Sequence, residues 1–372
     1  MSDQLAAEWQ DARSRLERAT ADPSLRRQAN RLLWDLCQFL RDRDAALTHL
    51  HAAIAEDPLF TRPHLADVPP SRSVLVLAAP GDYQTNLPLD RLFDESTLLH
   101  TLWIADPDAV LRDPHAAIPR DLPAVDVVFI AIAEDARSGA MLRAADALAA
   151  SLGKPTMNCG ARIARLSRAG TAHLLENLAD GVVPSHHLVP HGEPSPIALP
   201  IIIRPLGSHA GEKLHCVRSD AELDAYYVEH RRVRVFTIAP FIDYRSADGF
   251  WRKYRVIFVD GIAYPLHLAI HHDWAVWYYN AGMQACPRKQ AEEQRFLDNL
   301  TAAMPARAVR ALTEIARRVG LDYFGLDCSV LADGRLLVFE VETGMIVQNG
   351  SGTASTRIRQ ATERLIERRR AR

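Results

Sequence analysis

A strand near the C-terminus carries two glutamates inside an otherwise apolar stretch. This stretch, residues 337–342, follows an Asp-Gly turn, and the apolar run before the turn contains Asp327. An Asp-Gly pair between two apolar runs predicts an antiparallel hairpin. Because side chains alternate along a strand, Glu340 and Glu342 lie on one face, and Asp327 can face the same side. The pattern therefore predicts a sheet in which three carboxylates gather on one face.

Three carboxylates on one face repel one another, so their gathering needs an explanation. Hard cations such as Mg²⁺ neutralise such clusters through oxygen ligands, and Mn²⁺ is an alternative occupant. The other interpretation is a solvated polar face. A buried strand, in which a carboxylate needs a partner, is favoured by the apolar neighbours Leu337, Val338, Phe339 and Val341. We therefore predict that the metal ligands are Asp327, Glu340 and Glu342.

A second pattern is a buried strand that ends in a Gly- and Ser-rich loop. Residues 201–211 read Ile-Ile-Ile-Arg-Pro-Leu-Gly-Ser-His-Ala-Gly. Backbone N–H groups of such a loop can surround phosphate oxygens, and its glycines permit close approach. Arg204 would add a fixed positive charge. The alternative is a tight turn in which Arg204 forms an ion pair.

A third pattern places two cations on one face of a strand. In residues 251–261, Lys253 and Arg255 stand two positions apart. Fixed cations beside a metal site suit the negative charge that develops on a transferring phosphoryl group. The alternative is a surface strand with exposed basic residues. We predict that both side chains take part in catalysis.

The stretch after this strand combines histidines with aromatic residues. His271 could bind substrate or carry protons, and four rings could form a substrate platform: Trp274, Trp277, Tyr278 and Tyr279. The alternative is an aromatic-packed loop with a capping histidine. A second histidine pair, 186–187, indicates a solvated turn.

The remaining pattern predicts a mixed α/β protein. Residues 1–70 are expected to form a helical arm and a Pro-rich linker, because leucines recur there at helical spacing. Buried strands alternate with helices through 71–160, which indicates a small parallel α/β domain. No GxGxxG motif follows its first strand, so a dinucleotide site is not expected there. Residues 161–350 contain two hairpins, and 351–372 form a basic helical tail.

Composition argues against several classes of protein. The 372 residues carry a formal net charge of −2, which gives no overall attraction to nucleic acid or anionic membrane. The longest apolar runs are strand-length, and the first residues lack the apolar segment of a signal peptide. The five cysteines are scattered and have no zinc-ligand spacing. We expect a cytoplasmic protein with free thiols that binds neither nucleic acid nor membrane.

The order of these motifs resembles the ATP-grasp superfamily, in particular its RimK-like branch of carboxylate–amine ligases. The resemblance covers about residues 71 to 350. It implies a Rossmann-like pre-ATP-grasp domain followed by a two-lobed ATP-grasp domain, with ATP and Mg²⁺ as cofactors.

The resemblance also assigns roles to individual positions. Arg168 and Arg204 stand where the family has phosphate-contacting lysines, and Arg255 where an arginine steadies the acyl-phosphate transition state. Asp327 and Glu340 match two metal ligands. The phosphate loop would contain Gly207, Ser208, His209 and Gly211. The hinge that holds adenine would contain Ala239, Phe241 and Ile242, with Asp243 or Asp248 at the ribose.

Three departures from the family pattern affect these assignments. Both lysines are arginine, so the charge is kept but the point-charge geometry is not. Pro240 stands where a glutamate often contacts the adenine amine. Glu342 replaces an asparagine and adds negative charge to the metal site.

The resemblance implies an ATP- and Mg²⁺-dependent ligase that joins a small-molecule or peptide carboxylate to an amine. One alternative is a kinase with the same ATP site. Another is a non-catalytic nucleotide-binding module, whose helical arm would dock a protein partner.

Overall fold

The computed structural model describes residues 3–64, 69–208, 211–278, 280–347 and 352–371, with side chains from Glu8 onward. The chain forms two compact units. Unit 1 comprises residues 1–164, 346–349 and 363–372, and unit 2 comprises 165–345 and 350–362. Within the described ranges, no helix has the length and apolar character needed to cross a membrane.

Unit 1 begins with the expected helices, α1 (Asp3–Ala19), α2 (Arg26–Phe39) and α3 (Arg43–Glu56). Asp42 caps α3, because its side chain accepts a hydrogen bond from the Ala45 backbone N–H. The helices pack against a sheet rather than extending from it. Trp34 of α2 lies edge-on to Trp103, with ring centroids 5.4 Å apart. Helix α2 therefore contacts the sheet of unit 1 through Trp34.

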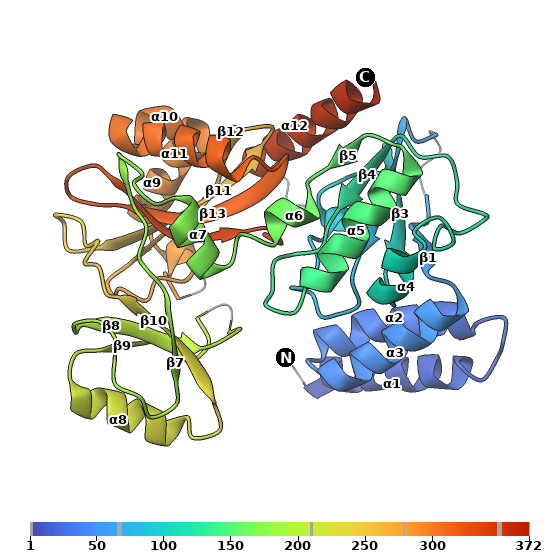
Figure 1. Ribbon diagram of the computed structural model, residues 1–372, viewed down its shortest axis with the longest axis horizontal. Coiled ribbons are helices and arrows are strands. Elements are labelled where there is room, and N and C mark those ends of the chain that lie inside the picture. The colour runs from blue at the N-terminus through green and yellow to red at the C-terminus, as the bar shows by residue number, and fades with distance from the viewer. Residues whose placement is uncertain (1–2, 65–68, 209–210, 279, 348–351, 372) are drawn as a thin grey trace. The chain divides into compact units, whose positions relative to one another are not determined.

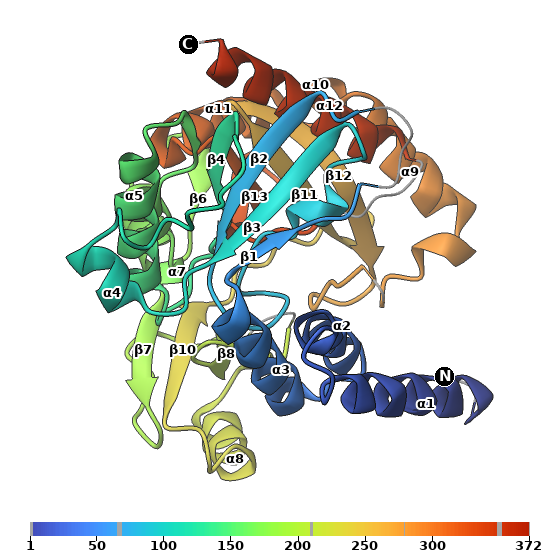
Figure 2. The ribbon, with the colours of Figure 1, turned by 90° about the vertical axis from the view of Figure 1, so that its right-hand side faces the viewer.

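The sheet of unit 1 has the strand order β1-β3-β2-β4-β5. Its members are β1 (Leu59–Thr61), β2 (Arg72–Ala78), β3 (Thr97–Trp103), β4 (Val127–Ile130) and β5 (Thr156–Met157). All neighbours are parallel except β1, which pairs antiparallel with β3 at one edge (Figure 2). The linker expected before residue 71 therefore contains a short strand. Short helices η1 (Leu89–Arg91), α4 (Pro107–Arg112) and α6 (Gly160–Ile163) accompany the longer α5 (Gly139–Leu152).

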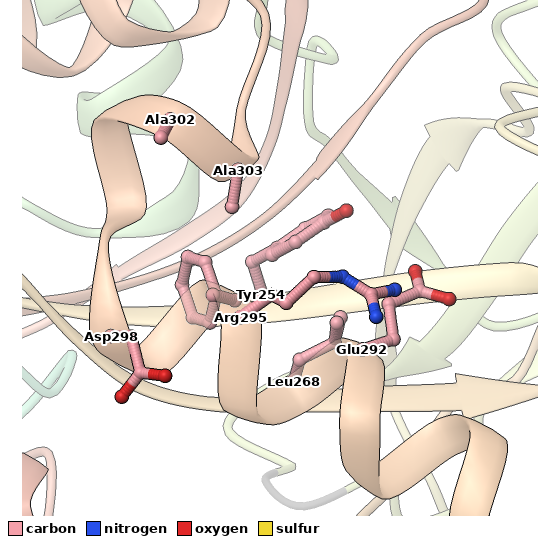
Figure 3. Close-up of a pocket in the computed structure, with 8 residues that line it drawn as sticks. Tyr254, Leu268, Glu292, Arg295, Asp298, Ala302 and Ala303 are labelled. Atoms are coloured by element: carbon pink, nitrogen blue, oxygen red, sulfur yellow. The ribbon is translucent and has the colours of Figure 1, made fainter.

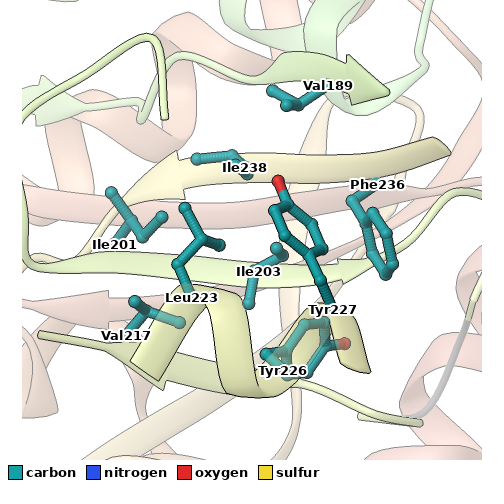
Figure 4. Packing of buried hydrophobic residues seen from close by; sticks show 9 residues of the cluster. All are labelled: Val189, Ile201, Ile203, Val217, Leu223, Tyr226, Tyr227, Phe236 and Ile238. Carbon is teal, nitrogen blue, oxygen red and sulfur yellow. The ribbon is translucent and has the colours of Figure 1, made fainter. Parts of the chain in front are cut away.

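Unit 2 contains two sheets. The smaller has the order β7-β10-β8-β9, with β7 (His187–Pro190), β10 (Val235–Pro240), β8 (Ile201–Pro205) and β9 (His215–Val217). Helix α8 (Asp220–Glu229), capped by Ser219, covers one face. Ile201 and Ile203 point into the core beneath it, together with Tyr226, Tyr227 and Phe236 (Figure 4). By alternation Arg204 lies on the opposite face.

The larger sheet of unit 2 has the order β12-β11-β13-β14-β6. Its strands are β11 (Trp251–Val259), β12 (Ile262–His271), β13 (Tyr323–Val330), β14 (Leu336–Glu342) and β6 (Gly181–Val182). The turn between β11 and β12 has positive φ at both Asp260 and Gly261, as a two-residue hairpin turn requires. Both predicted hairpins are therefore confirmed.

Helices cover one face of this larger sheet (Figure 1). They are α9 (Pro287–Asp298), α10 (Leu300–Ala303) and α11 (Ala306–Val319). Phe296 of α9 contacts Tyr254 of β11, with ring centroids 5.1 Å apart. Helix α7 (Arg168–Leu174), the single-turn η2 (Met283–Ala285) and the C-terminal α12 (Thr353–Arg370) complete the chain. The mixed α/β class is confirmed, and unit 2 has the two sheets that a two-lobed domain requires.

Candidate active site

Four polar side chains form one row across the larger sheet of unit 2. His267 on β12 pairs with Arg255 on β11, and Arg255 pairs with Asp327 on β13. Asp327 in turn pairs with Glu340 on β14. Directly paired residues in antiparallel strands project from the same face. The row therefore places an imidazole, a guanidinium and two carboxylates side by side.

Two one-residue register shifts produce this row. One lies between Arg255 and Val256, and the other between Asp327 and Cys328. Counted from the turns, the partner of Arg255 would be Leu266 and that of Asp327 would be Phe339. One extra residue in β12 and one in β14 bring His267 and Glu340 to these positions. Such β-bulges occur often beside active sites, where they redirect side chains.

Asp327 is the most enclosed charged group of the row. It has no exposed surface, and its carboxylate contacts Lys253 Nζ at 2.6 Å and Arg255 Nε at 2.7 Å. Burial acts to raise the pKa of Asp327, but the two cations outweigh it and hold the pKa well below its usual range. Lys253 and Arg255 are thus brought together as predicted, on one buried carboxylate.

Glu340 pairs with a cation from a different part of unit 2. Arg168 is the first residue of α7, after the capping residue Ser167, and its Nη2 lies 2.7 Å from a Glu340 carboxylate oxygen. Burial acts to raise the pKa of Glu340, and Arg168 outweighs it and lowers the pKa. Arg168, whose role only the resemblance had assigned, therefore contacts one of the predicted metal ligands, Glu340, directly.

Among the described residues, Glu342 forms no ion pair comparable to those of Asp327 and Glu340. Burial, reinforced by the charge of Glu340, raises its pKa to about 7. One of its carboxylate oxygens accepts a hydrogen bond from the Gly344 N–H at 2.9 Å. Its strand partner is Gly325, where a Cβ would come within 2.2 Å of the Met345 sulfur. The glycine therefore allows the segment after β14 to pack close to the sheet.

The three carboxylates do not yet form a metal-ligand group. Among the described residues, no three acidic, histidine or cysteine side chains are arranged to hold a metal ion. The donors nevertheless fit Mg²⁺, which prefers carboxylate oxygens. Burial first, and then the charge of Glu340, raise the pKa of Glu342, and a divalent cation between the two carboxylates would relieve the repulsion.

Arg204 binds its own loop. Its Nε donates to Ser208 Oγ at 2.8 Å, and its Nη2 donates to the Ser208 carbonyl. Positive φ at Gly207 and Gly211 shows that the loop needs glycine at both positions. His209 lies outside the described residues. Burial and then the charge of Arg168 lower the pKa of Arg204 to about 10, so the two predicted phosphate cations influence each other.

His186 lies in the same electrostatic environment. Burial and then the charge of Arg168 lower its pKa to about 4. Its Nδ1 is buried without a hydrogen-bond partner. The predicted solvated turn is therefore wrong for His186. Its neighbours in sequence are polar, and its burial depends on distant residues, so local pattern carried no signal.

The predicted adenine hinge lies at the end of β10. Ala239 is buried and pairs with Ile202. The Phe241 N–H donates to the Pro200 carbonyl at 3.0 Å, and Pro240 has no N–H, so fewer backbone donors remain for a base. Ile242 is half-buried. The exposed Asp243 pairs with Arg245 at 3.3 Å.

His271 lies four residues beyond His267 on the same face, about 13 Å along the strand. Its Nδ1 accepts the Asp273 N–H at 3.1 Å, which is the capping role given as the alternative. Trp274 packs against Phe241, with ring centroids 5.7 Å apart. Trp277 is 49% exposed. Tyr278 contacts His267, and Tyr279 lies outside the described residues.

The opposite face of the sheet contains a hollow of about 500 Å³ between the strands and α9 (Figure 3). Tyr254 and Leu268 line it from the strands, and Glu292 and Arg295 line it from the helix. Since neighbouring residues on a strand face opposite sides, this hollow lies away from Arg255. Within the described residues, its lining includes no predicted site residue.

Sequence reasoning passed over His267, which pairs directly with Arg255. The available signal was the period-two alternation across the β11–β12 turn. Simple counting from Asp260-Gly261 leads to Leu266 instead, because the register shift is not visible in the pattern.

No family model and no curated protein matches this chain. Several solved structures are similar. The VanG D-Ala:D-Ser ligase from Enterococcus faecalis is 11% identical, with a TM-score of 0.49 over 79% of this chain and 99% of that one. The D-alanine–D-alanine ligase from Bacillus anthracis, complexed with ATP, is 12% identical, with a TM-score of 0.49 over 81% of this chain and 98% of that one.

A RimK-domain ATP-grasp protein from Sphaerobacter thermophilus is 16% identical, with a TM-score of 0.44 over 79% of this chain and 99% of that one. Because these TM-scores are below 0.5, the matches are reported as similarity, and no role is assigned to this chain from them. The interpretation of the site rests on the contacts of this chain's own residues.

Proposed function

We propose that this chain is an ATP- and Mg²⁺-dependent ligase of the ATP-grasp type, which activates a carboxylate as an acyl phosphate and joins it to an amine. The row formed by Arg255, Asp327 and Glu340 carries the proposal. Its carboxylates are held by Lys253 and Arg168. Clustered cations and carboxylates of this kind suit the binding and transfer of phosphoryl groups.

The cations have distinct tasks in this proposal. Arg168 and Arg204, which influence each other's charge, bind the polyphosphate. Arg255 is fixed by two hydrogen bonds to Asp327, so it can offset charge on the transferring group without reorganising. Lys253 shares the same carboxylate and keeps that group net positive.

The reaction balances as two displacements. A substrate carboxylate oxygen attacks the γ-phosphorus, the bond from that phosphorus to the β–γ bridging oxygen breaks, and ADP leaves. The amine nitrogen then attacks the carbonyl carbon of the acyl phosphate, the carbon–oxygen bond breaks, and phosphate leaves as the nitrogen loses a proton. The products are an amide, ADP and phosphate.

Magnesium would be held by Asp327, Glu340 and Glu342. When bound, such a cation neutralises charge on the phosphate oxygens. The chain's own residues prepare the site. Arg168 keeps Glu340 ionised, and Glu342 loses its proton when a positive charge lies nearby.

The first test is a thermal shift with ATP and Mg²⁺. A ligand that binds only the folded state increases the free energy of unfolding, by about 2.7 kcal/mol at a ligand concentration of 100 times its Kd. The melting temperature rises as a result. We expect a Mg²⁺-dependent shift in the wild type, its loss in Glu340→Ala, and its retention in Glu176→Ala, whose side chain is 67% exposed. Absence of any shift in the wild type would contradict the proposal.

Product analysis separates the ligase from its rival. A ligase releases ADP and free phosphate together when both substrates are present. ADP formed without free phosphate would instead indicate phosphoryl transfer to a hydroxyl. Small carboxylates and peptides, each with and without an amine, are the substrates to screen.

A further inference from the structure

His267 occupies the β12 end of the row and has no task in the proposed reaction. It pairs directly with Arg255, and its Nδ1 is buried without a hydrogen-bond partner in the part of the chain that the structure describes. Burial, followed by the charge of Arg255, lowers its pKa to about 3. The imidazole is therefore neutral at neutral pH.

The enclosure of Nδ1 determines the tautomer of His267. A buried N–H without an acceptor is rarer in proteins than a buried acceptor without a donor, and Nδ1 is the buried nitrogen of this ring. Nδ1 is therefore the lone-pair nitrogen, and the proton lies on Nε2. His267 is thus a neutral hydrogen-bond donor.

A second set of contacts fixes the ring. The centroids of His267 and Tyr278 are 4.8 Å apart. Tyr278 hydrogen-bonds the Glu293 side chain, and Glu293 Oε1 accepts the Leu268 N–H at 3.1 Å. Glu293 thereby ties Tyr278 to the residue that follows His267. This support holds the imidazole in one orientation, which is what a binding group needs.

The two cations beside His267 are balanced by only one carboxylate, so they can attract a further anion. Lys253 and Arg255 share the single carboxylate of Asp327, so this group of three keeps a net positive charge. Arg255 uses Nε and Nη2 for Asp327, and a guanidinium has further N–H donors. A planar carboxylate fits between such a guanidinium and a neutral N–H donor.

We propose that His267 and Arg255 together bind the carboxylate that the enzyme activates, with His267 donating from Nε2–H. The inference rests on the proposed function for the identity of the reaction. The inference places the substrate carboxylate, which receives the phosphoryl group, at the β12 end of the row. His267 is then a substrate-binding residue, and Tyr278 and Glu293 are positioning residues that act through it.

The test uses acetate as the probe, because acetate contains the recognised group alone. Full-length protein with ¹⁵N-labelled histidine is titrated with sodium acetate against sodium chloride at equal ionic strength. The His267 signal, assigned by its loss in His267→Gln, is expected to show the neutral Nε2–H tautomer. It should shift saturably with acetate and not with chloride.

Variants then measure the strength of the contact. His267→Leu removes the donor and should weaken acetate binding about tenfold, as expected for one hydrogen bond to a charged group. His267→Gln keeps an N–H at a similar reach and should recover part of the loss. His173→Gln, at a histidine whose side chain is 86% exposed, should leave binding unchanged.

The outcomes separate the two proposals. If ATP and Mg²⁺ stabilise the protein but acetate leaves the His267 signal unmoved, the inference is overturned and the ligase proposal stands. A cationic or Nδ1–H form of His267 overturns it as well. If acetate binds at His267 but ATP gives no thermal shift, the carboxylate site stands and the ligase proposal fails.

Discussion

The two five-stranded sheets of this protein differ in what their strands carry. In the sheet of unit 1, β2 pairs with β3 and with β4 in an unbroken parallel register. Fully buried apolar residues such as Leu75 and Val128 fill it. The larger sheet of unit 2 is antiparallel where the candidate site lies, and it contains two register shifts and a row of charged side chains. The regularly paired sheet of unit 1 contributes apolar side chains to a core, whereas the sheet with β-bulges in unit 2 brings charged side chains together on one face.

Two buried histidines show the same difference at the level of one residue. His100 in unit 1 pairs with Thr61, and its Nδ1 lies 2.9 Å from the threonine Oγ1. His267 in unit 2 pairs with Arg255. Burial lowers the pKa of both rings. Lowered pKa values therefore do not distinguish the two histidines, whereas the charge of the strand partner does.

The largest effect is expected from removing the buried carboxylate. Asp327→Ala leaves Lys253 and Arg255 without their partner, so it should lower the free energy of unfolding by about 3–5 kcal/mol. Urea denaturation measures this, and nucleotide binding should be lost as well. In unit 1, Leu77→Ala should cost about 2–5 kcal/mol but leave ATP affinity of the folded fraction unchanged. An equal loss of ATP affinity in Asp327→Ala and Leu77→Ala would contradict the difference drawn between the two sheets.

A mainly functional effect is expected at Arg255, because Lys253 still pairs with the buried carboxylate of Asp327. Arg255→Gln removes a charge that offsets the transferring phosphoryl group, so phosphate release should slow about 10²–10³-fold. The ATP-dependent thermal shift should remain. The matched variant is Arg335→Gln at the turn before β14, where Arg335 pairs with Asp333 at 2.7 Å. If Arg335→Gln slows the reaction as much, the row has no special role.

Acid should weaken unit 1 through His100. Its pKa is lowered in the folded protein, so the unfolded chain binds the proton more readily. The resulting stability is present above the ordinary histidine pKa of about 6.5 and is lost as the pH falls toward the folded value, at about 1.4 kcal/mol for each pKa unit. His100→Gln should therefore show a shallower fall in unfolding free energy between about pH 7 and about pH 5. An unchanged slope would contradict this.

The smallest effect is expected on the far face of the unit 2 sheet. Arg295 is exposed and lines the hollow under α9. Arg295→Ala should change stability by no more than about 0.5 kcal/mol and leave the rate of phosphate release unaltered. A clear loss of activity would show that the hollow is coupled to the row.

Local patterns predicted the elements that set the site, but not their exact alignment. The turn at Asp260-Gly261 and the alternation of Lys253 and Arg255 placed both cations on one face. Counting could not reveal the register shifts, which depend on how four strands pair. The contact between Arg168 and Glu340 spans 172 residues of sequence, and no local pattern reports such a distance.

Other misses have equally physical causes. Helix α9 was not predicted because it has little apolar periodicity; Phe296 is its buried residue. Strand β1 is three residues long and lies in a Pro-rich stretch. His186 is buried by residues far from it in sequence. These elements depend on tertiary packing, which overrides weak local preference.

The contact between Arg204 and Ser208 has a kinetic consequence. Phosphate that binds the Nε and Nη2 donors of Arg204 must first displace the hydroxyl and carbonyl of Ser208. The chain therefore competes with its own nucleotide, and the observed affinity is the intrinsic affinity reduced by the fraction of molecules in which Arg204 is released. As nucleotide concentration rises, the observed association rate should level off at the rate of that release, and Ser208→Ala should raise the plateau.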